Sequence, residues 1–253
     1  MASYYRSNAV YDGLATTSNP PFVWAAGNAW LLAYGDETCT PRLLVYARGS
    51  SATPDARLRK IMESLGAGAG LPTAEIEFDD LAPEILEVKL RVGTASTWAS
   101  LSMNELRSKF GGFGLPVSTT PTGKYLNDRE SSAYHRWQRA ALGGGLTVSD
   151  MDLFRLDAGG GNVVELVELK RSIIALEKWA PYADDYRNFD LLLRVVSPSG
   201  IPFHIAYNVR SKGPPAHDDA SQMRVFSYEQ PKAPRPLAAV SFGDFVRGTY
   251  LTT

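Results

Sequence analysis

Cysteine is almost absent from this sequence, with Cys39 the only one among 253 residues. A lone cysteine excludes an intramolecular disulfide framework and a zinc site built from cysteines. The three histidines, His135, His204 and His217, lie far apart in the sequence without the spacing of metal ligands. We therefore expect a reducing compartment, and histidines that are ordinary helix, strand or loop residues.

Long apolar runs and the common nucleotide or hydrolase motifs are also missing. No stretch approaches the ~18 apolar residues that a membrane-spanning helix needs, and the N-terminal segment lacks the apolar run of a signal peptide. Neither a phosphate-binding G-x-x-x-x-G-K-[ST] loop nor a G-x-S-x-G nucleophile elbow is present. We expect a cytoplasmic protein without a membrane partner.

An excess of charge of either sign is lacking as well. Lys and Arg total 26 and Asp and Glu total 27, so the formal net charge is -1. This balance excludes a protein held to nucleic acid by bulk charge, but it allows a local basic groove. Hydrophobic residues at 44% and charged residues at 21% are typical of a globular chain, of a length that suits one large domain or two small ones.

The first hundred residues alternate between strand and helix patterns. Strands are predicted at Trp30–Tyr34, Arg42–Ala47, Ala74–Phe78 and Ile85–Val92. Helical spacing covers Asp55–Leu65, with Gly66 as a stop, and Met103–Phe110. We place a domain boundary near residue 100, so that residues 1–99 form an α/β region of unknown role, suited to DNA contact or dimerisation, and residues 100–253 a second domain.

The second region is predicted to place a hairpin between helices. Helical patterns cover Asn127–Leu142 and Ile174–Val195, with Pro181 able to start a second helix in the latter. Between them, Met151–Leu156 and Val163–Lys170 are predicted to pair as strands across a Gly-rich turn. Further elements are expected as a strand at Pro202–Val209, a loop at Ser211–Gln222, a strand at Met223–Tyr228 and a final helix at Phe242–Gly248.

The hairpin holds the most informative residues of the chain. Because strand side chains alternate between faces, Glu168 and Lys170 share a face, and pairing across the turn brings Asp152 close to Glu168. Two carboxylates on adjacent strands suit a hard divalent cation such as Mg²⁺, which leaves room for water and substrate phosphate. A nearby lysine can stabilise charge that develops on the phosphate. The alternative interpretation is a solvated hairpin with ordinary surface ion pairs.

This pattern resembles the PD-(D/E)XK nuclease superfamily, in which a mixed central sheet is flanked by helices in a restriction-endonuclease-like fold. The matching residues are Asp152 in DMDLF and Glu168-Leu169-Lys170 in VELVELKR. The resemblance implies that Asp152 and Glu168 bind Mg²⁺, with Mn²⁺ as a substitute, and that Lys170 takes part in catalysis. It also suggests a glutamate on the preceding helix, Glu130. Met151 stands where the family often has proline, which leaves Asp150 as an alternative ligand.

The resemblance covers residues 124–209 and implies further polar residues around the site. The helix after the hairpin would offer Lys178, Tyr182, Asp185, Tyr186 and Asn188. A rim that contacts phosphates is expected from Arg136, Arg139, Lys178, Arg187, Arg210 and Lys212.

The function expected from these residues is metal-dependent hydrolysis of DNA, by an endonuclease of restriction, recombination or repair type. The residues do not distinguish DNA from RNA, and cleavage of two strands by a protein with one site favours a homodimer. The alternative is a module that keeps the nuclease fold but binds nucleic acid or protein without catalysis. A further hypothesis, an enzyme whose site lies in residues 1–100, has no constellation of residues to support it.

Overall fold

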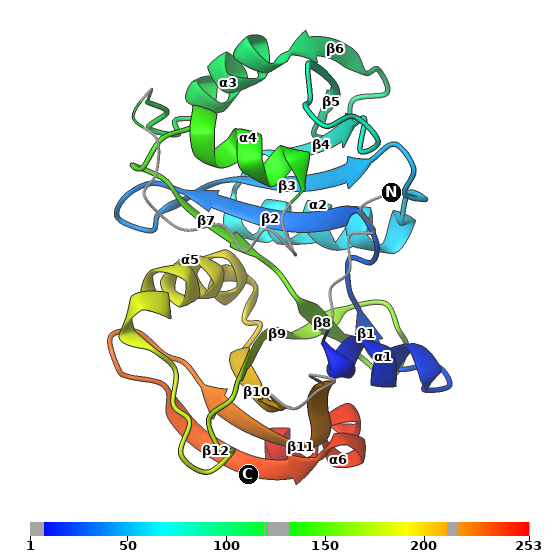
Figure 1. Cartoon of the computed structure of the whole chain (residues 1–253), viewed down its shortest axis with the longest axis vertical. Helices are drawn as coiled ribbons and strands as arrows, with labels where there is room; N and C mark the ends of the chain where they lie inside the picture. Colours follow the sequence, from blue (N-terminus) through cyan, green and yellow to red (C-terminus); the bar gives the residue numbers. More distant parts are fainter. Residues whose placement is uncertain (1–7, 119, 121–131, 212–216, 253) are drawn as a thin grey trace.

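The chain folds into two six-stranded sheets with helices on their faces, as the computed structural model describes for residues 8–118, 120, 132–211 and 217–252 (Figure 1). The first sheet has the strand order β6-β5-β4-β3-β2-β7. Its strands are β2 (Ala29–Gly35), β3 (Pro41–Gly49), β4 (Thr73–Phe78), β5 (Glu87–Val92), β6 (Ala99–Ser102) and β7 (Thr147–Asp150). The second sheet has the order β1-β8-β9-β10-β11-β12. Its strands are β1 (Phe22–Val23), β8 (Leu153–Leu156), β9 (Val163–Ser172), β10 (Phe203–Ser211), β11 (His217–Ser227) and β12 (Arg235–Ser241).

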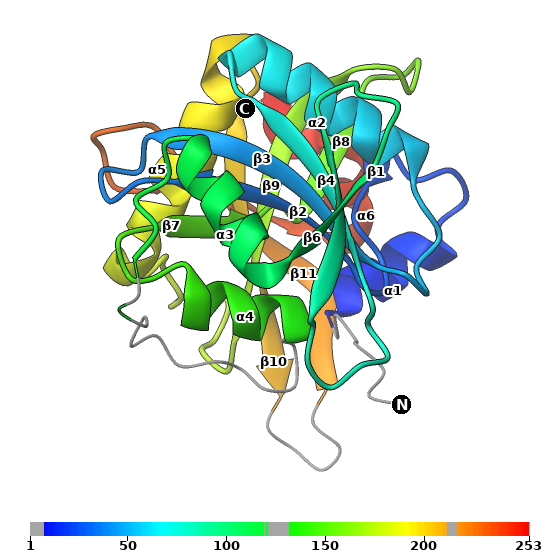
Figure 2. The same ribbon diagram turned by 90° about the horizontal axis from the view of Figure 1, so that it is seen from above.

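The sheets and helices are stacked in layers, with three apolar cores between the layers. Helices α3 (Met103–Gly112) and α4 (Ala133–Ala141) cover the outer face of the first sheet, as Figure 2 shows from above. Helices α2 (Ala56–Ala69) and α5 (Tyr186–Val196) fill the space between the two sheets. Helices α1 (Ala9–Thr16) and α6 (Phe242–Arg247) pack on the outer face of the second sheet. The mixed α/β class expected from the sequence is confirmed, with two mixed sheets where one had been predicted.

The chain passes between the two sheets at two neighbouring places. The strands β1 and β2 are close in sequence, as are β7 and β8, and β1 pairs with β8 while β2 pairs with β7, both antiparallel. The Met151 N–H donates to the Leu31 carbonyl at 2.8 Å between these ladders. Residues 1–99 and residues 100–253 therefore each contribute strands to both sheets, and the boundary expected near residue 100 falls within β6.

The predicted strands and most helices form where the patterns placed them, and local contacts explain the ends of α2. The Asp55 carboxylate caps its start by accepting from the Arg57 and Leu58 N–H groups. The helix continues through Gly66, which was expected to end it, and stops at Gly70 with φ +65°. Gly66 lies against β4, where a Cβ would come within 2.5 Å of the Thr73 side chain. It is therefore a close-packing glycine and not a helix terminator.

Other expectations differ from the structure. The described part of the helix expected over 127–142 begins with Ser132 as its cap, and residues 127–131 lie outside the described residues. Ile174–Val195 was expected to be helical, in one or two helices, but α5 starts only at Tyr186. The preceding segment contains only the short 3-10 helix Ala183–Asp185, and its Trp179 is buried flat against Tyr207, with ring centroids 4.1 Å apart. The described part of the expected loop 211–222 belongs to β10 and β11, and β7 and β12 were not predicted.

A buried charge network fixes the C-terminal segment to the second sheet. Arg155 of β8 and Glu165 of β9 face each other, and the guanidinium donates to the carboxylate at 2.6 Å. His204 and the Tyr250 hydroxyl hold the same carboxylate at 2.6 and 2.8 Å. Arg155 also donates to the Phe245 carbonyl, which ties α6 to the sheet. Because Glu165 is fully buried, its charge depends on these partners.

We expect Arg155→Met to destabilise the protein by about 3–5 kcal/mol, because it leaves the Glu165 carboxylate buried without its cation. Urea unfolding measures this change. The matched control is Arg247→Met, since Arg247 pairs with Asp244 on the surface and exposed pairs contribute about 1 kcal/mol or less. Equal losses in the two variants would contradict the importance of the buried network.

Candidate functional site

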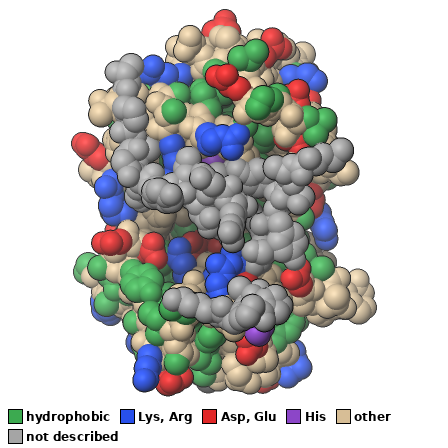
Figure 3. Space-filling view, in the orientation of Figure 1, with side chains coloured by type: hydrophobic (Ala, Val, Ile, Leu, Met, Phe, Trp, Pro, Cys, Tyr) green, Lys and Arg blue, Asp and Glu red, His purple; other side chains and the backbone are tan. Residues whose placement is uncertain are grey.

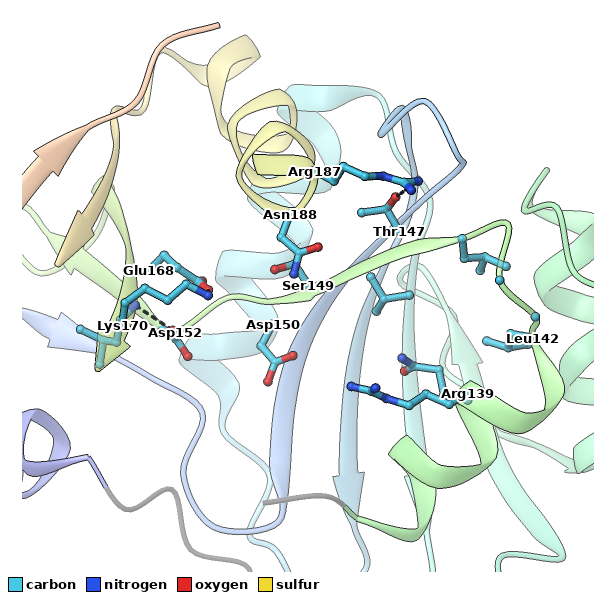
Figure 4. Close-up of a pocket in the computed structure, with 16 residues that line it drawn as sticks. Arg139, Leu142, Thr147, Ser149, Asp150, Asp152, Glu168, Lys170, Arg187 and Asn188 are labelled. Atoms are coloured by element: carbon cyan, nitrogen blue, oxygen red, sulfur yellow. Dashed lines mark hydrogen bonds and ion pairs between the residues drawn. The ribbon is translucent and has the colours of Figure 1, made fainter. Parts of the chain in front are cut away.

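A cleft of about 430 Å³ opens where the chain passes from the first sheet to the second (Figure 4). One wall is the end of α4 with the Gly143–Gly144 turn, and another is the first turn of α5. The edge strand β7 runs along it, and the end of β9 closes it. Asp150, Asp152, Glu168 and Lys170 all line this cleft, so the structure brings together the residues that the hairpin pattern singled out.

The β8–β9 register explains how Asp152 meets Glu168. Leu153 pairs with Val167, so the next position outward sets Asp152 beside Glu168, as the hairpin prediction required. Each carboxylate oxygen of Asp152 has a donor: the Leu169 N–H at 2.9 Å and the Tyr11 hydroxyl at 3.0 Å. Asp152 is therefore held in one orientation by a strand and by α1.

Glu168 and Lys170 form a largely buried pair, which is an ion pair when Glu168 is ionised. The Lys170 Nζ lies 3.0 Å from Glu168 Oε1 and 3.8 Å from Asp185 Oδ2, and 5.4 Å from the centre of the Phe189 ring. Burial lowers the pKa of Lys170, but the negative charges of Glu168 and Asp185 outweigh burial and raise it above its usual value. The lysine is thus held in its charged form.

Glu168 differs from an ordinary paired carboxylate. It is only 6% exposed, and its Oε2 is buried without a hydrogen-bond partner among the described residues. Burial raises the pKa of Glu168 to about 8; Lys170 opposes the shift, and the charges of Asp152 and Asp150 add to it. The negative charge of a buried carboxylate beside two others is unfavourable. Binding a proton or a cation removes this cost.

The donor set suits a hard cation in part. Across the described ranges, no group of three or more His, Cys, Asp or Glu residues is arranged to hold a metal ion. Mg²⁺, however, is commonly held by one or two protein carboxylates, with water completing its coordination. Asp152 and the unpartnered oxygen of Glu168 meet that requirement, and Asp150 lies in the same cleft. Glu130, the further catalytic candidate, lies outside the described residues.

Five of the six expected phosphate contacts are described, and they separate into two groups. Arg139 and Arg187 line the cleft, and Arg187 donates to the Glu37 carbonyl and the Thr147 hydroxyl at 2.9 and 3.0 Å. Arg136, Lys178 and Arg210 do not line it. The Arg136 guanidinium donates to the Pro83 carbonyl and that of Arg210 to Asp218, whereas Lys212 lies outside the described residues.

Among the described side chains that are visible in Figure 3, basic and acidic groups are interspersed. This distribution agrees with the formal net charge of -1. An anionic ligand on this face would therefore depend on individual cations such as those in the cleft.

Two residues of the site were not found from the sequence. Tyr11 lies in a segment with no assigned role, and only the packing of α1 on the second sheet brings it to Asp152. Gln138 lines the cleft from α4, one helical turn after the buried Tyr134. The usable signal for Gln138 was a polar residue on the apolar side of an amphipathic helix. Asp185 and Asn188, expected from the resemblance, do lie at the site.

No known protein family, curated protein or solved structure matches this chain. Among the described residues, no helix combines the length and apolar character that crossing a membrane requires.

For a divalent cation bound by Asp152, Tyr11→Phe is expected to weaken binding by about tenfold or more, because Asp152 loses the donor that orients one of its oxygens. Titration calorimetry with Mn²⁺ measures the affinity, and thermal unfolding checks that the fold is kept. The matched control is Tyr182→Phe, since Tyr182 is half exposed and does not line the cleft. Unchanged Mn²⁺ affinity in a folded Tyr11→Phe protein would contradict a positioning role for Tyr11.

Proposed function

We propose that this chain is a metal-dependent nuclease that hydrolyses phosphodiester bonds of DNA, with Asp152 and Glu168 as Mg²⁺ ligands and Lys170 as a catalytic cation. The observation that carries the proposal is the unpartnered, buried Oε2 of Glu168 in a cleft shared with Asp152 and Lys170. The PD-(D/E)XK resemblance of the hairpin supports the same conclusion.

A comparison within one strand sharpens this point. Glu165 and Glu168 are both buried in β9, but they lie on opposite faces of the second sheet. Both oxygens of Glu165 are bonded, to Arg155, His204 and Tyr250. Glu168 has one oxygen paired with Lys170 and the other unsatisfied. Glu165 thus has the contacts of a structural carboxylate, whereas Glu168 retains an unused ligand atom.

The side chains have distinct roles in this proposal. When bound, Mg²⁺ would polarise the phosphate and lower the pKa of a bound water. Asp152, fixed by Tyr11 and the Leu169 N–H, would hold the cation together with Glu168. Lys170, fixed by Glu168 and Asp185, would donate to the water or to the phosphate oxygens as negative charge develops. Asp150 is the alternative ligand from β7.

Cleavage is the direct test of the proposal. Supercoiled plasmid and a single-stranded circular DNA are incubated with Mg²⁺, with Mn²⁺ and with EDTA. We expect metal-dependent cleavage by the wild-type protein, and a loss of at least about 100-fold in rate in Glu168→Ala. The matched control, Glu177→Ala, removes an exposed glutamate outside the cleft and should cleave at the wild-type rate.

The outcomes separate the two functions weighed from the sequence. No cleavage of either DNA under either metal favours a binding module without catalysis. Cleavage that survives in a folded Glu168→Ala protein would place the chemistry elsewhere in the chain.

Metal affinity should also depend on pH. Glu168, with a pKa raised to about 8 by burial, is mainly protonated below that pH, and a cation must displace the proton. Affinity for Mn²⁺ is therefore expected to rise from pH 6 to pH 8 by up to about tenfold per unit, and to level off above pH 8. Calorimetry in two buffers of different ionisation enthalpy should detect release of about one proton at pH 7. A flat affinity profile without proton release would contradict Glu168 as a ligand.

A further inference from the structure

The cleft continues beyond the candidate metal site, between α4 and the first turn of α5 (Figure 4). Each of these helices presents an amide side chain with an arginine next to it in the sequence. Gln138 and Arg139 come from α4, and Arg187 and Asn188 come from α5. None of these four side chains is needed for the proposed metal chemistry.

Gln138 is fixed as a donor toward the cleft. It is only 8% exposed, and its Oε1 accepts the Tyr34 hydroxyl at 2.6 Å. The Tyr34 hydroxyl is in turn 3.0 Å from that of Tyr134, so the chain of hydrogen bonds is anchored in the core under α4. With its oxygen occupied in this way, Gln138 has its NH₂ group left to donate to a ligand.

Asn188 supplies a complementary acceptor on the opposite side. It lines the cleft from α5, and its Oδ1 is buried with no hydrogen-bond partner in the described part of the chain. Leaving such an atom unsatisfied is unfavourable, so a ligand that donates to it gains affinity. The two walls thus offer one fixed amide donor and one unsatisfied amide acceptor.

This combination matches the chemistry of a nucleotide. Amide side chains recognise the donor and acceptor edges of nucleobases, and guanidinium groups bind phosphate. The whole cleft, with the candidate metal site included, measures about 430 Å³, which is the size of a site for one small molecule. A base inside a duplex is stacked and paired, and must be unpaired to enter such a pocket.

We infer that this part of the cleft is a nucleotide pocket for one unpaired nucleotide next to the bond that is cut, and that the substrate is single-stranded DNA or a duplex with a single-stranded end. Gln138 and Asn188 contact the base, and Arg139 and Arg187 contact the flanking phosphates. The inference rests on the proposed function for its place beside the cleaved bond, but the binding of a single strand can be tested without cleavage.

Fluorescence anisotropy measures this binding. The buffer contains EDTA, which prevents metal-dependent cleavage of the probe. The probes are a labelled single strand of about 15 nucleotides and the same strand in a blunt duplex. We expect the wild-type protein to bind the single strand at least tenfold more tightly than the duplex. Equal affinity for the two probes would overturn the inference.

Four variants locate the contact. Asn188→Leu and Gln138→Leu should each weaken single-strand binding at least fivefold, and Asn188→Leu leaves the Tyr34 hydrogen bond of the core intact. Arg139→Ala should weaken binding and reduce the salt dependence by about one phosphate contact. The matched control is Arg136→Ala on the same helix, because Arg136 does not line the cleft, and its affinity should stay at the wild-type value. Equal losses in Arg136→Ala and Arg139→Ala, or wild-type binding by a folded Asn188→Leu protein, would overturn the pocket.

The same probes, incubated with Mg²⁺, distinguish a failure of this inference from a failure of the proposed function. If the duplex is cleaved as fast as the single strand, the result contradicts the nucleotide pocket but supports the nuclease activity. If the single strand binds tightly in a way that depends on Asn188, but no DNA is cleaved, the result supports the nucleotide pocket and contradicts the nuclease activity.

Discussion

The antiparallel pairing of β8 with β9 is the constraint on which the candidate site depends. With Leu153 opposite Val167, Asp152 reaches Glu168 just beyond the last paired residues, and the Leu169 N–H is available to its carboxylate. A shift of one residue would turn Glu168 and Lys170 to the opposite face of the sheet. The buried Arg155–Glu165 pair, which lies across the same two strands, opposes such a shift because it would separate two desolvated charges.

The passage between the sheets then determines what surrounds these charges. A single run of chain forms β7 in the first sheet and β8 in the second, so Asp150 and Asp152 lie at the junction. Helices that pack on different faces, α4 outside the first sheet and α5 between the sheets, meet at this junction. The cleft is therefore made by two layers of the fold, and its walls carry different side chains from each layer.

Burial gives the site its electrostatic character. The Glu168 carboxylate, buried beside Asp152 and Asp150, has a raised pKa, while the Lys170 ammonium is stabilised by two carboxylates. One pKa shift favours the neutral form of Glu168, and the other favours the charged form of Lys170. Strongly shifted pKa values within one cleft are typical of functional sites, whereas a pair of side chains exposed to water would show neither shift. The fully bonded Glu165, three residues earlier, shows that burial in this sheet does not by itself leave an atom unsatisfied.

The local pattern of the hairpin was enough to predict that Asp152, Glu168 and Lys170 come together, because strand alternation and a short Gly-rich turn are local properties. The buried strands β2, β3 and β4 were predictable for the same reason. Division into two sheets, the edge strand β7 and the joining of Tyr11 to Asp152 across 141 positions were decided by tertiary packing. Asn188 was expected at the site from the resemblance, but Gln138 faces it across the cleft only because α4 and α5 pack on different layers that meet at β7. Side chains from separate layers share no local pattern in the sequence, so only the folded chain places them on one site.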